Sequence, residues 1–168
     1  DELCYILDVE GLLSECLPEV AEKLNPKVKP TGAWKSRLMG KTLLVADDSR
    51  SIRMYLTNVL TQLELQHLVF ENGQELIDYM DKLPNAESIS VVITDLEMPV
   101  ASGHTVIKFI RNDERFRKLV IGVHSSMTAE NNERDARVLG ADFFIGKINT
   151  EGLVSTLEKM TEKMEEQE

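Results

Sequence analysis

The chain has 168 residues, 42% of them hydrophobic, which is enough for one full domain with a packed core and some additional chain. Its formal net charge of −10 disfavours nonspecific binding to nucleic acid or to an anionic membrane surface. No apolar run is long enough to span a bilayer, so we expect no direct insertion into a membrane. Cys4 and Cys16 form no CxxC pair, which favours two buried or free thiols and a cytoplasmic location.

The first forty residues divide into an apolar part and a linker. Residues 2–9 predict a strand, and residues 9–24 carry apolar side chains near the helical period, with Pro18 as an interruption. Residues 25–40 contain two prolines and two glycines and predict a linker. A lone strand and helix cannot bury their own apolar faces. We therefore interpret residues 1–24 as the end of a domain whose main part lies outside this sequence.

From Lys41 onward, five apolar strands alternate with five helices. The expected strands are Thr42–Ala46, Leu65–Phe70, Ser88–Thr94, Leu119–His124 and Asp142–Ile145. The first expected helix is capped by Ser49 or Ser51, and its apolar positions are Ile52, Met54, Tyr55, Val59 and Leu60. The other expected helices are Gln74–Leu83, Thr105–Arg111, Ala129–Leu139, which Gly140 closes, and Glu151–Met164. This alternation predicts an α/β fold, a parallel sheet covered by helices on both faces.

Polar residues follow the expected strands at their carboxyl ends: Asp47 and Asp48 after the first, Asp95 after the third, Ser125 after the fourth and Lys147 near the fifth. In a doubly wound five-stranded sheet of order 2-1-3-4-5, the first and third strands are neighbours, so the three aspartates converge. Like charges about 5 Å apart repel by roughly 3 kcal/mol at an effective dielectric constant of 20. A hard divalent cation would offset this repulsion, and all-oxygen ligands favour Mg²⁺.

These residue types suit phosphoryl transfer. The Ser125 hydroxyl and the Lys147 ammonium, with the metal, can hold the oxygens of a transferring phosphoryl group. Asp95 is then the nucleophile and forms an aspartyl phosphate. Each residue alone has an ordinary interpretation: Asp48 as a helix cap, Ser125 as a turn residue and Lys147 as a surface lysine. Their convergence on one sheet edge favours the functional interpretation.

Four stretches together carry a family resemblance: Leu-Val-Ala-Asp-Asp-Ser-Arg at 44–50, Ile-Thr-Asp-Leu-Glu-Met-Pro at 93–99, His-Ser-Ser at 124–126 and Gly-Ala-Asp-Phe-Phe-Ile-Gly-Lys at 140–147. On these motifs, residues 41–162 resemble a receiver domain of two-component response regulators, which has a flavodoxin/CheY-like fold. The resemblance implies that Asp95 accepts a phosphoryl group from a partner histidine kinase. Such a domain is a switch rather than an enzyme, although it could catalyse its own phosphorylation and dephosphorylation.

The same resemblance assigns roles to individual residues. Asp48 would be a direct Mg²⁺ ligand, Asp47 would act largely through water, and the backbone carbonyl of Glu97 would complete the metal shell. Ser125 would move to bind the phosphoryl group, and Phe144 would occupy the aromatic switch position. One departure concerns Ile148, which stands where the family usually has a proline after the lysine. A cis peptide bond before Ile148 is therefore doubtful, because a non-proline cis bond costs about 3 kcal/mol.

The N-terminal residues narrow the resemblance. Cys-Tyr-Ile-Leu-Asp-Val-Glu-Gly-Leu-Leu at 4–13 resembles the last strand and helix of a CheW-like coupling domain. This order of parts, with 1–24 as the coupling-domain end, 25–40 as linker and 41–168 as receiver, is similar to chemotaxis coupling proteins of the CheV type. It implies a chemotaxis-type histidine kinase and chemoreceptors as partners. An unpaired strand edge in residues 2–9 could also recruit a second copy and form a homodimer.

Three alternatives remain at this point. The chain could be a free-standing receiver from another two-component pathway, with an unrelated N-terminal extension. It could be a Mg²⁺-dependent phosphohydrolase with an Asp nucleophile, although no extra domain or loop is long enough to build a substrate pocket. A DNA-binding regulator is disfavoured, because the receiver-like region is flanked only by the coupling-like stretch and an acidic tail.

Overall fold

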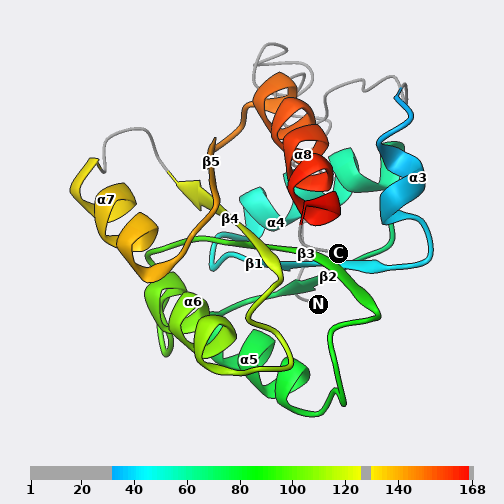
Figure 1. Cartoon of the computed structure of the whole chain (residues 1–168). Helices are drawn as coiled ribbons and strands as arrows, with labels where there is room; N and C mark the ends of the chain where they lie inside the picture. The colour runs from blue at the N-terminus through cyan, green and yellow to red at the C-terminus, as the bar shows by residue number, and fades with distance from the viewer. Residues whose placement is uncertain (1–31, 126–129, 167–168) are drawn as a thin grey trace, which may run out of the picture.

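The computed structural model describes residues 32–125 and 130–166, and within the described part it has a five-stranded parallel sheet in the order β2-β1-β3-β4-β5 (Figure 1). The strands are β1 Thr42–Ala46, β2 His67–Phe70, β3 Ile89–Thr94, β4 Val120–Ser125 and β5 Phe143–Gly146. The helices are α3 Lys35–Leu38, α4 Arg50–Gln62, α5 Gly73–Asp81, α6 Gly103–Asn112, α7 Glu130–Leu139 and α8 Thr150–Glu165. The strand order and the parallel pairing confirm the fold predicted from the sequence.

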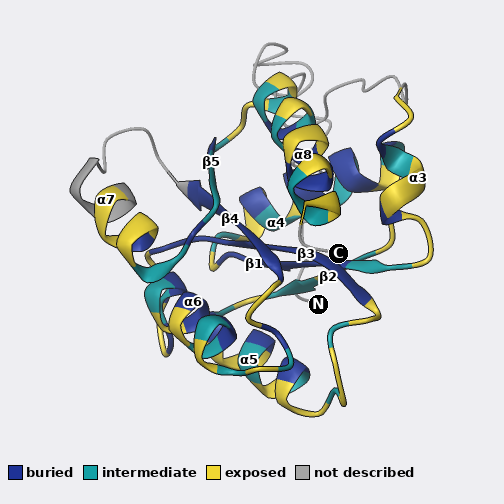
Figure 2. Ribbon diagram, in the orientation of Figure 1, coloured by how far each residue is buried: buried dark blue, intermediate teal, exposed yellow. Residues whose placement is uncertain are grey.

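The sheet separates two hydrophobic cores. One core lies under α4 and α8 and includes Val91 and Ile93 of β3. The other lies under α5, α6 and α7 and includes Val92 of the same strand. All six residues of β3 are buried, as expected for a central strand whose side chains alternate between two covered faces. In Figure 2 the central strands β1, β3 and β4 are accordingly mostly dark blue, the edge strands β2 and β5 are mostly teal, and the outward sides of the helices are yellow.

Helix α4 corrects two sequence expectations. Its buried residues are Ile52, Tyr55, Leu56, Val59 and Leu60, which recur at the helical period. Met54 was expected on this apolar stripe, but its side chain is exposed, because two residues along a helix turn it about 200° away from Ile52. Ser49 occupies the N-cap position but makes no side-chain capping hydrogen bond. Three other helices do have side-chain caps, from Asn72, Ser102 and Asn149.

A short helix lies within the stretch expected to be a linker. In α3, Leu38 is buried together with the preceding Trp34, and both belong to the core under α4 and α8. An ion pair of 2.6 Å between Arg37 and Glu165 also joins α3 to α8. No helical periodicity is visible in this stretch of sequence, because a single turn buries two side chains only where another helix provides the surface. The strand and helix expected within residues 1–24 lie outside the described residues.

α7 ends at Leu139, and Gly140 follows with a positive φ of 108°, as expected for a glycine that closes a helix. None of the helices in residues 32–125 and 130–166 is long and apolar enough to cross a membrane.

Candidate functional site

Strand register aligns Asp47, Asp95 and His124 at the carboxyl edge of the sheet. Ala46 of β1 pairs with Thr94 of β3, and Thr94 pairs with Val123 of β4, so the next residue on each chain continues the row. The backbone N–H of Asp95 donates to the carbonyl of Ala46 at 2.8 Å, which carries the pairing past the end of β3. Because side chains alternate along a strand, the row faces the layer of α4 and α8.

The Asp95 carboxylate is held at both oxygens. Its Oδ1 accepts a hydrogen bond from the backbone N–H of Leu96 at 2.8 Å, and its Oδ2 accepts one from the Lys147 ammonium at 2.8 Å. Only 5% of Asp95 is exposed, and this burial raises its pKa despite the opposing effect of Lys147. A buried carboxylate with a raised pKa and a fixed orientation is a candidate for chemistry rather than for a simple surface contact.

Lys147 follows β5 and bridges two carboxylates. Besides its bond to Asp95, its Nζ lies 3.2 Å from Oδ2 of Asp47. Burial lowers the pKa of Lys147, but the two carboxylates raise it by more than burial lowers it. The pKa of Lys147 therefore lies above its usual value, and the ammonium stays charged. The peptide bond before Ile148 is trans, and Ile148 has a positive φ of 56°. The loop that presents Lys147 is therefore strained at a β-branched residue.

The three aspartates form one cluster. Asp47, Asp48 and Asp95 each offer a carboxylate oxygen, and these atoms lie within 4.8 Å of one another. Asp47 and Asp95 are buried, whereas Asp48 is exposed at the mouth of the cluster. Oδ2 of Asp47 has no hydrogen-bond partner in the described part of the chain, although it is buried. A buried oxygen without a partner, next to two further carboxylates, fits a hard divalent cation such as Mg²⁺.

Asp47 remains charged in spite of its burial. Burial raises its pKa, but His124, Lys147 and the backbone N–H of Ser49 outweigh that effect and lower the pKa below its usual value. Oδ1 of Asp47 accepts the Ser49 N–H at 2.9 Å. The two buried aspartates thus differ: the environment favours the charged form of Asp47 and disfavours the charged form of Asp95.

For Ser125, Phe144 and Glu97, the structure gives a position but does not test the expected role. The backbone of Ser125 ends β4 and pairs with Gly146 of β5, while its side chain lies outside the described part. Phe144 lies in β5 beside Val123, half-buried, with the Arg137 guanidinium 4.7 Å from the ring centroid. Glu97 is exposed two residues after Asp95. The hydroxyl role of Ser125, the switch role of Phe144 and the metal contact of the Glu97 carbonyl stay predictions.

The sequence analysis did not identify Arg53, whose side chain holds the loop of Asp47 and Asp48 by hydrogen bonds. Its Nη1 donates to the carbonyls of Asp47 at 3.0 Å and Asp48 at 2.8 Å, and its Nη2 pairs with Glu71 at 2.7 Å. A signal was present, because Arg53 lies in the first turn of a helix, where the helix dipole disfavours a cation. A basic residue at such a position needs a partner elsewhere, and here the partner is the loop.

Gly103, at the start of α6, has a steric role in the structure. A Cβ atom at this position would collide with the backbone carbonyl oxygen of Asp95. The N–H of Gly103 also donates to the carbonyl of Leu96 at 3.0 Å. The start of α6 therefore packs directly on the backbone that carries Asp95, and any larger residue would displace it.

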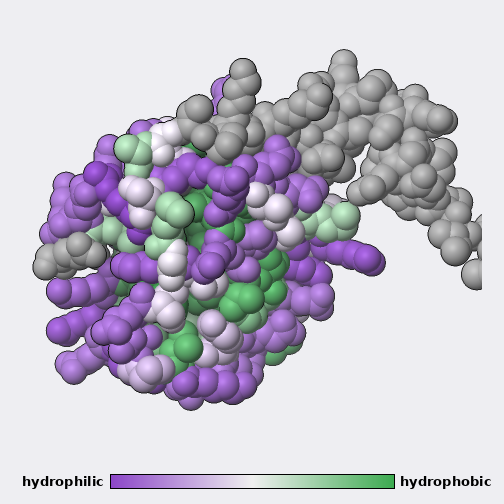
Figure 3. All heavy atoms as spheres, turned by 90° about the vertical axis from the view of Figure 1, so that its right-hand side faces the viewer, coloured by the Kyte–Doolittle hydropathy of each residue, from purple (hydrophilic) through white to green (hydrophobic). Residues whose placement is uncertain are grey.

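A hollow of about 450 Å³ lies at the other end of the sheet, away from the aspartates. Its apolar part comes from Ala86, Ile89, Leu119, Val120 and Met164, and charged residues such as Lys41 and Glu87 surround it. Figure 3 shows the molecule from the side on which α3 lies, where apolar residues gather between hydrophilic ones. The titratable cluster and the hollow are thus on opposite edges, and the cluster is the better candidate for chemistry.

Comparison with known proteins agrees with this geometry. Residues 43–158 match the model of the response regulator receiver domain, and the chain belongs to that family. Family membership gives it a phosphoacceptor role in two-component signalling. The solved structure of the chemotaxis protein CheY4 of Vibrio cholerae superimposes with a TM-score of 0.64 at 25% identity and covers 71% of this chain and 98% of that one. A receiver domain protein from Clostridium thermocellum, at 21% identity and a TM-score of 0.66, covers 74% and 97% and shows the same fold.

Two relatives extend further along the chain. The chemotaxis protein CheV2 of Helicobacter pylori is 37% identical over 149 residues, which is 89% of this chain and 47% of that protein. CheV1 of the same organism is 32% identical over 161 residues, which is 95% of this chain and 49% of that protein. The chain therefore spans about half the length of these curated relatives.

Proposed function

We propose that Asp95 is the phosphoacceptor of a Mg²⁺-dependent switch. The observation that carries the proposal is the 2.8 Å bond between Lys147 Nζ and Asp95 Oδ2 beside the cluster of three carboxylates. An Asp95 oxygen attacks the phosphorus, the bond from phosphorus to the histidine nitrogen of a partner kinase breaks, and that nitrogen keeps the electron pair. Mg²⁺, when bound, would neutralise charge on the phosphoryl oxygens.

The neighbouring residues divide the remaining work. Asp47, Asp48 and Asp95, with the backbone carbonyl of Glu97, would hold the metal. The Lys147 ammonium is already charged and lies 2.8 Å from Asp95. It can therefore move from the unphosphorylated Asp95 carboxylate to a phosphoryl oxygen without a change of protonation. The Ser125 hydroxyl would bind another oxygen, and Phe144 would follow that movement as the aromatic switch residue.

In the wider protein, this switch would modulate how a coupling domain joins chemoreceptors to a chemotaxis-type histidine kinase in the cytoplasm. Support comes from alignment length: the alignment to CheV1 covers 161 residues, whereas the receiver match covers only residues 43–158. Residues 1–24 would be the end of a CheW-like domain, 25–40 the connection and 41–168 the receiver. Since Trp34 and Leu38 pack on the receiver core, the connection would be anchored at its C-terminal end.

The test is intact mass after incubation with acetyl phosphate, with and without Mg²⁺. We expect one added phosphoryl group in the unaltered chain with metal, none in Asp95→Asn, and normal uptake in the control Asp113→Asn, an acid that pairs with Arg115 away from the cluster. Uptake by Asp95→Asn would refute the assignment. Transfer from a chemotaxis-type histidine kinase, compared with an unrelated histidine kinase, then tests the pathway, and equal transfer rates would contradict it.

A further inference from the structure

His124 is a buried polar residue to which the phosphorylation chemistry assigns no role. Only 1% of it is exposed, and neither ring nitrogen has a hydrogen-bond partner in the described part of the chain. Leaving a buried polar group unpaired has a cost in stability. A leucine or valine of suitable size would avoid that cost, so stability alone does not account for a histidine at this position.

The ring faces one specific atom. Nδ1 of His124 lies 3.7 Å from Oδ2 of Asp47, which is longer than a hydrogen bond but close enough to become one after a shift of under 1 Å. Oδ2 of Asp47 is itself buried without a hydrogen-bond partner. The His124 ring and an Asp47 oxygen that has an ion pair with Lys147 but no hydrogen bond therefore face each other across Asp95, in the row that the strand register produces.

The rest of the Asp47 carboxylate shows why this contact matters. Oδ1 is fixed by the N–H of Ser49, so the position of Oδ2 depends on Lys147 at 3.2 Å and on His124 at 3.7 Å. Lys147 is closer to Asp95, at 2.8 Å, and the proposed function moves it towards the phosphoryl group. Once Lys147 leaves, His124 is the remaining described side chain that can orient Oδ2.

We propose that His124 is a positioning residue that donates its Nδ1–H to Oδ2 of Asp47 and holds this carboxylate in the orientation that Mg²⁺ requires. The inference rests on the proposed function, because it takes the aspartate cluster as the metal site. A neutral imidazole suffices, since the role needs one N–H donor and no change of charge. Partners that orient a metal ligand in this way commonly account for about 10- to 100-fold in metal affinity.

Three substitutions separate the donor from the bulk of the ring. His124→Asn places an amide N–H near the position of Nδ1, His124→Gln places it nearer Nε2, and His124→Leu keeps volume without a donor. The measurement is Mg²⁺ affinity of the unphosphorylated chain by calorimetric titration, together with thermal unfolding without metal. His67→Leu, at the amino end of β2, is the control for loss of a histidine far from the site.

We expect His124→Leu and His124→Gln to weaken Mg²⁺ binding by about tenfold, with an unfolding temperature in metal-free buffer equal to or above that of the unaltered chain. His124→Asn should stay within about threefold of the unaltered affinity, because it retains the donor. Unchanged Mg²⁺ affinity in a folded His124→Leu variant would overturn the proposal. So would equal weakening in the Asn and Leu variants.

This outcome is separable from a failure of the proposed function. If Asp95 is not the phosphoacceptor, either Asp95→Asn still takes up a phosphoryl group from acetyl phosphate or no variant takes one up at saturating Mg²⁺, yet the order of Mg²⁺ affinities is still measurable. If Asp95 is the acceptor and His124 has no positioning role, all variants take up one phosphoryl group and bind Mg²⁺ alike.

Discussion

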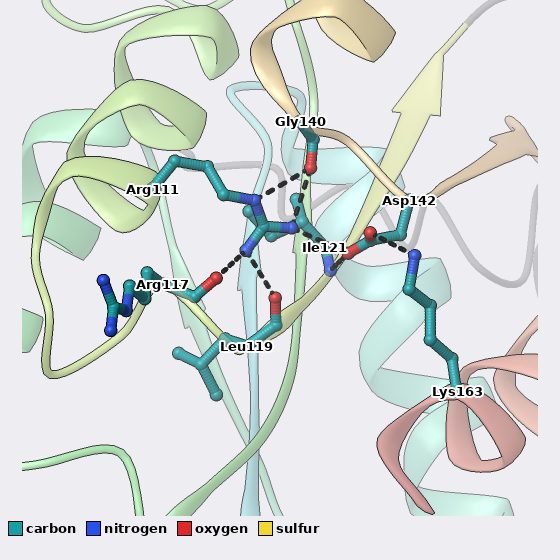
Figure 4. Close-up of polar contacts among 7 residues, drawn as sticks. All are labelled: Arg111, Arg117, Leu119, Ile121, Gly140, Asp142 and Lys163. Atoms are coloured by element: carbon teal, nitrogen blue, oxygen red, sulfur yellow. Dashed lines mark hydrogen bonds and ion pairs between the residues drawn. The ribbon is translucent and has the colours of Figure 1, made fainter. Parts of the chain in front are cut away.

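The two edges of the sheet differ in how completely their charged and polar side chains are paired. At the carboxyl edge, three carboxylate oxygens lie within 4.8 Å of one another, and the buried Oδ2 of Asp47 and ring of His124 lack hydrogen-bond partners in the described part. At the amino edge of β4 and β5, the partly buried charges of Arg111 and Asp142 are paired. Arg111 of α6 donates to the carbonyls of Gly140, Arg117 and Leu119 and to the Asp142 carboxylate (Figure 4).

Asp142 completes that network. It accepts from the backbone N–H of Ile121 at 2.7 Å and from Lys163 of α8 at 2.7 Å, so one carboxylate ties β4, α6 and α8 together. The contrast shows that the polar atoms of the Arg111–Asp142 network are paired within the fold, whereas the carboxyl edge keeps Oδ2 of Asp47 and the His124 ring buried without hydrogen bonds in the described part of the chain. Functional clusters of this kind commonly reduce stability, which the rest of the fold must supply.

The largest effect expected at the amino edge comes from Arg111→Ala. It would leave the half-buried Asp142 carboxylate with one cation fewer and several carbonyls without donors, and we expect the free energy of unfolding to fall by about 3 kcal/mol. The control is Arg117→Ala, whose exposed side chain lies 3.9 Å from Glu114 and should change stability by less than about 0.5 kcal/mol. Urea unfolding measures both. Equal losses would remove the contrast between the edges.

At the carboxyl edge the sign should reverse. The raised pKa of Asp95 means that folding disfavours its charged form, so Asp95→Asn should raise the free energy of unfolding at pH 7 by about 1 kcal/mol. An acid whose pKa is raised in the folded state adds most to the free energy of unfolding below its unfolded-state pKa of about 3.9. This stabilising contribution is lost as the pH rises through the pKa of the folded state. The advantage of Asp95→Asn should therefore grow between pH 4 and pH 7. A constant difference across this range would contradict the assigned cause.

The smallest effect concerns backbone strain in the loop of Lys147. Ile148 has a positive φ of 56°, a conformation that β-branched residues rarely adopt and asparagine tolerates better. We expect Ile148→Asn to raise the free energy of unfolding by about 0.5–1 kcal/mol, less any loss of apolar contact from this partly exposed side chain. Ile148→Val keeps the branch and should show no gain. A gain in both variants would mean that the strain does not arise from β-branching.

Much of the fold was predictable from local patterns. The apolar run before Asp95 predicted a strand buried on both faces, and β3 is buried throughout. The expected helix Glu151–Met164 corresponds to α8, whose buried residues include Leu153, Leu157 and Met160. The failures are also local: Met54 lies one position off the buried stripe, and the short helix α3 has too few residues to show a period.

The site divides differently. Asp47, Asp48, Asp95 and Lys147 could be selected from the sequence, because each follows a strand, and parallel strands end at one edge of a sheet. Arg53 and His124 could not be assigned a partner in that way. Their contacts depend on where a helix and a neighbouring strand come to lie, which a pattern along the chain does not record.

The sequence by itself determined the alternation of strands and helices, the family, and the edge at which the acidic residues gather, since these follow from side-chain periodicity and short motifs. Tertiary structure alone decided which charges are paired. The 2.8 Å contact of Lys147 with Asp95, the collision that reserves position 103 for glycine, and the approach of His124 to Asp47 join residues distant in sequence. Such contacts depend on strand register and packing to within about an ångström, because hydrogen bonds weaken steeply beyond their usual length.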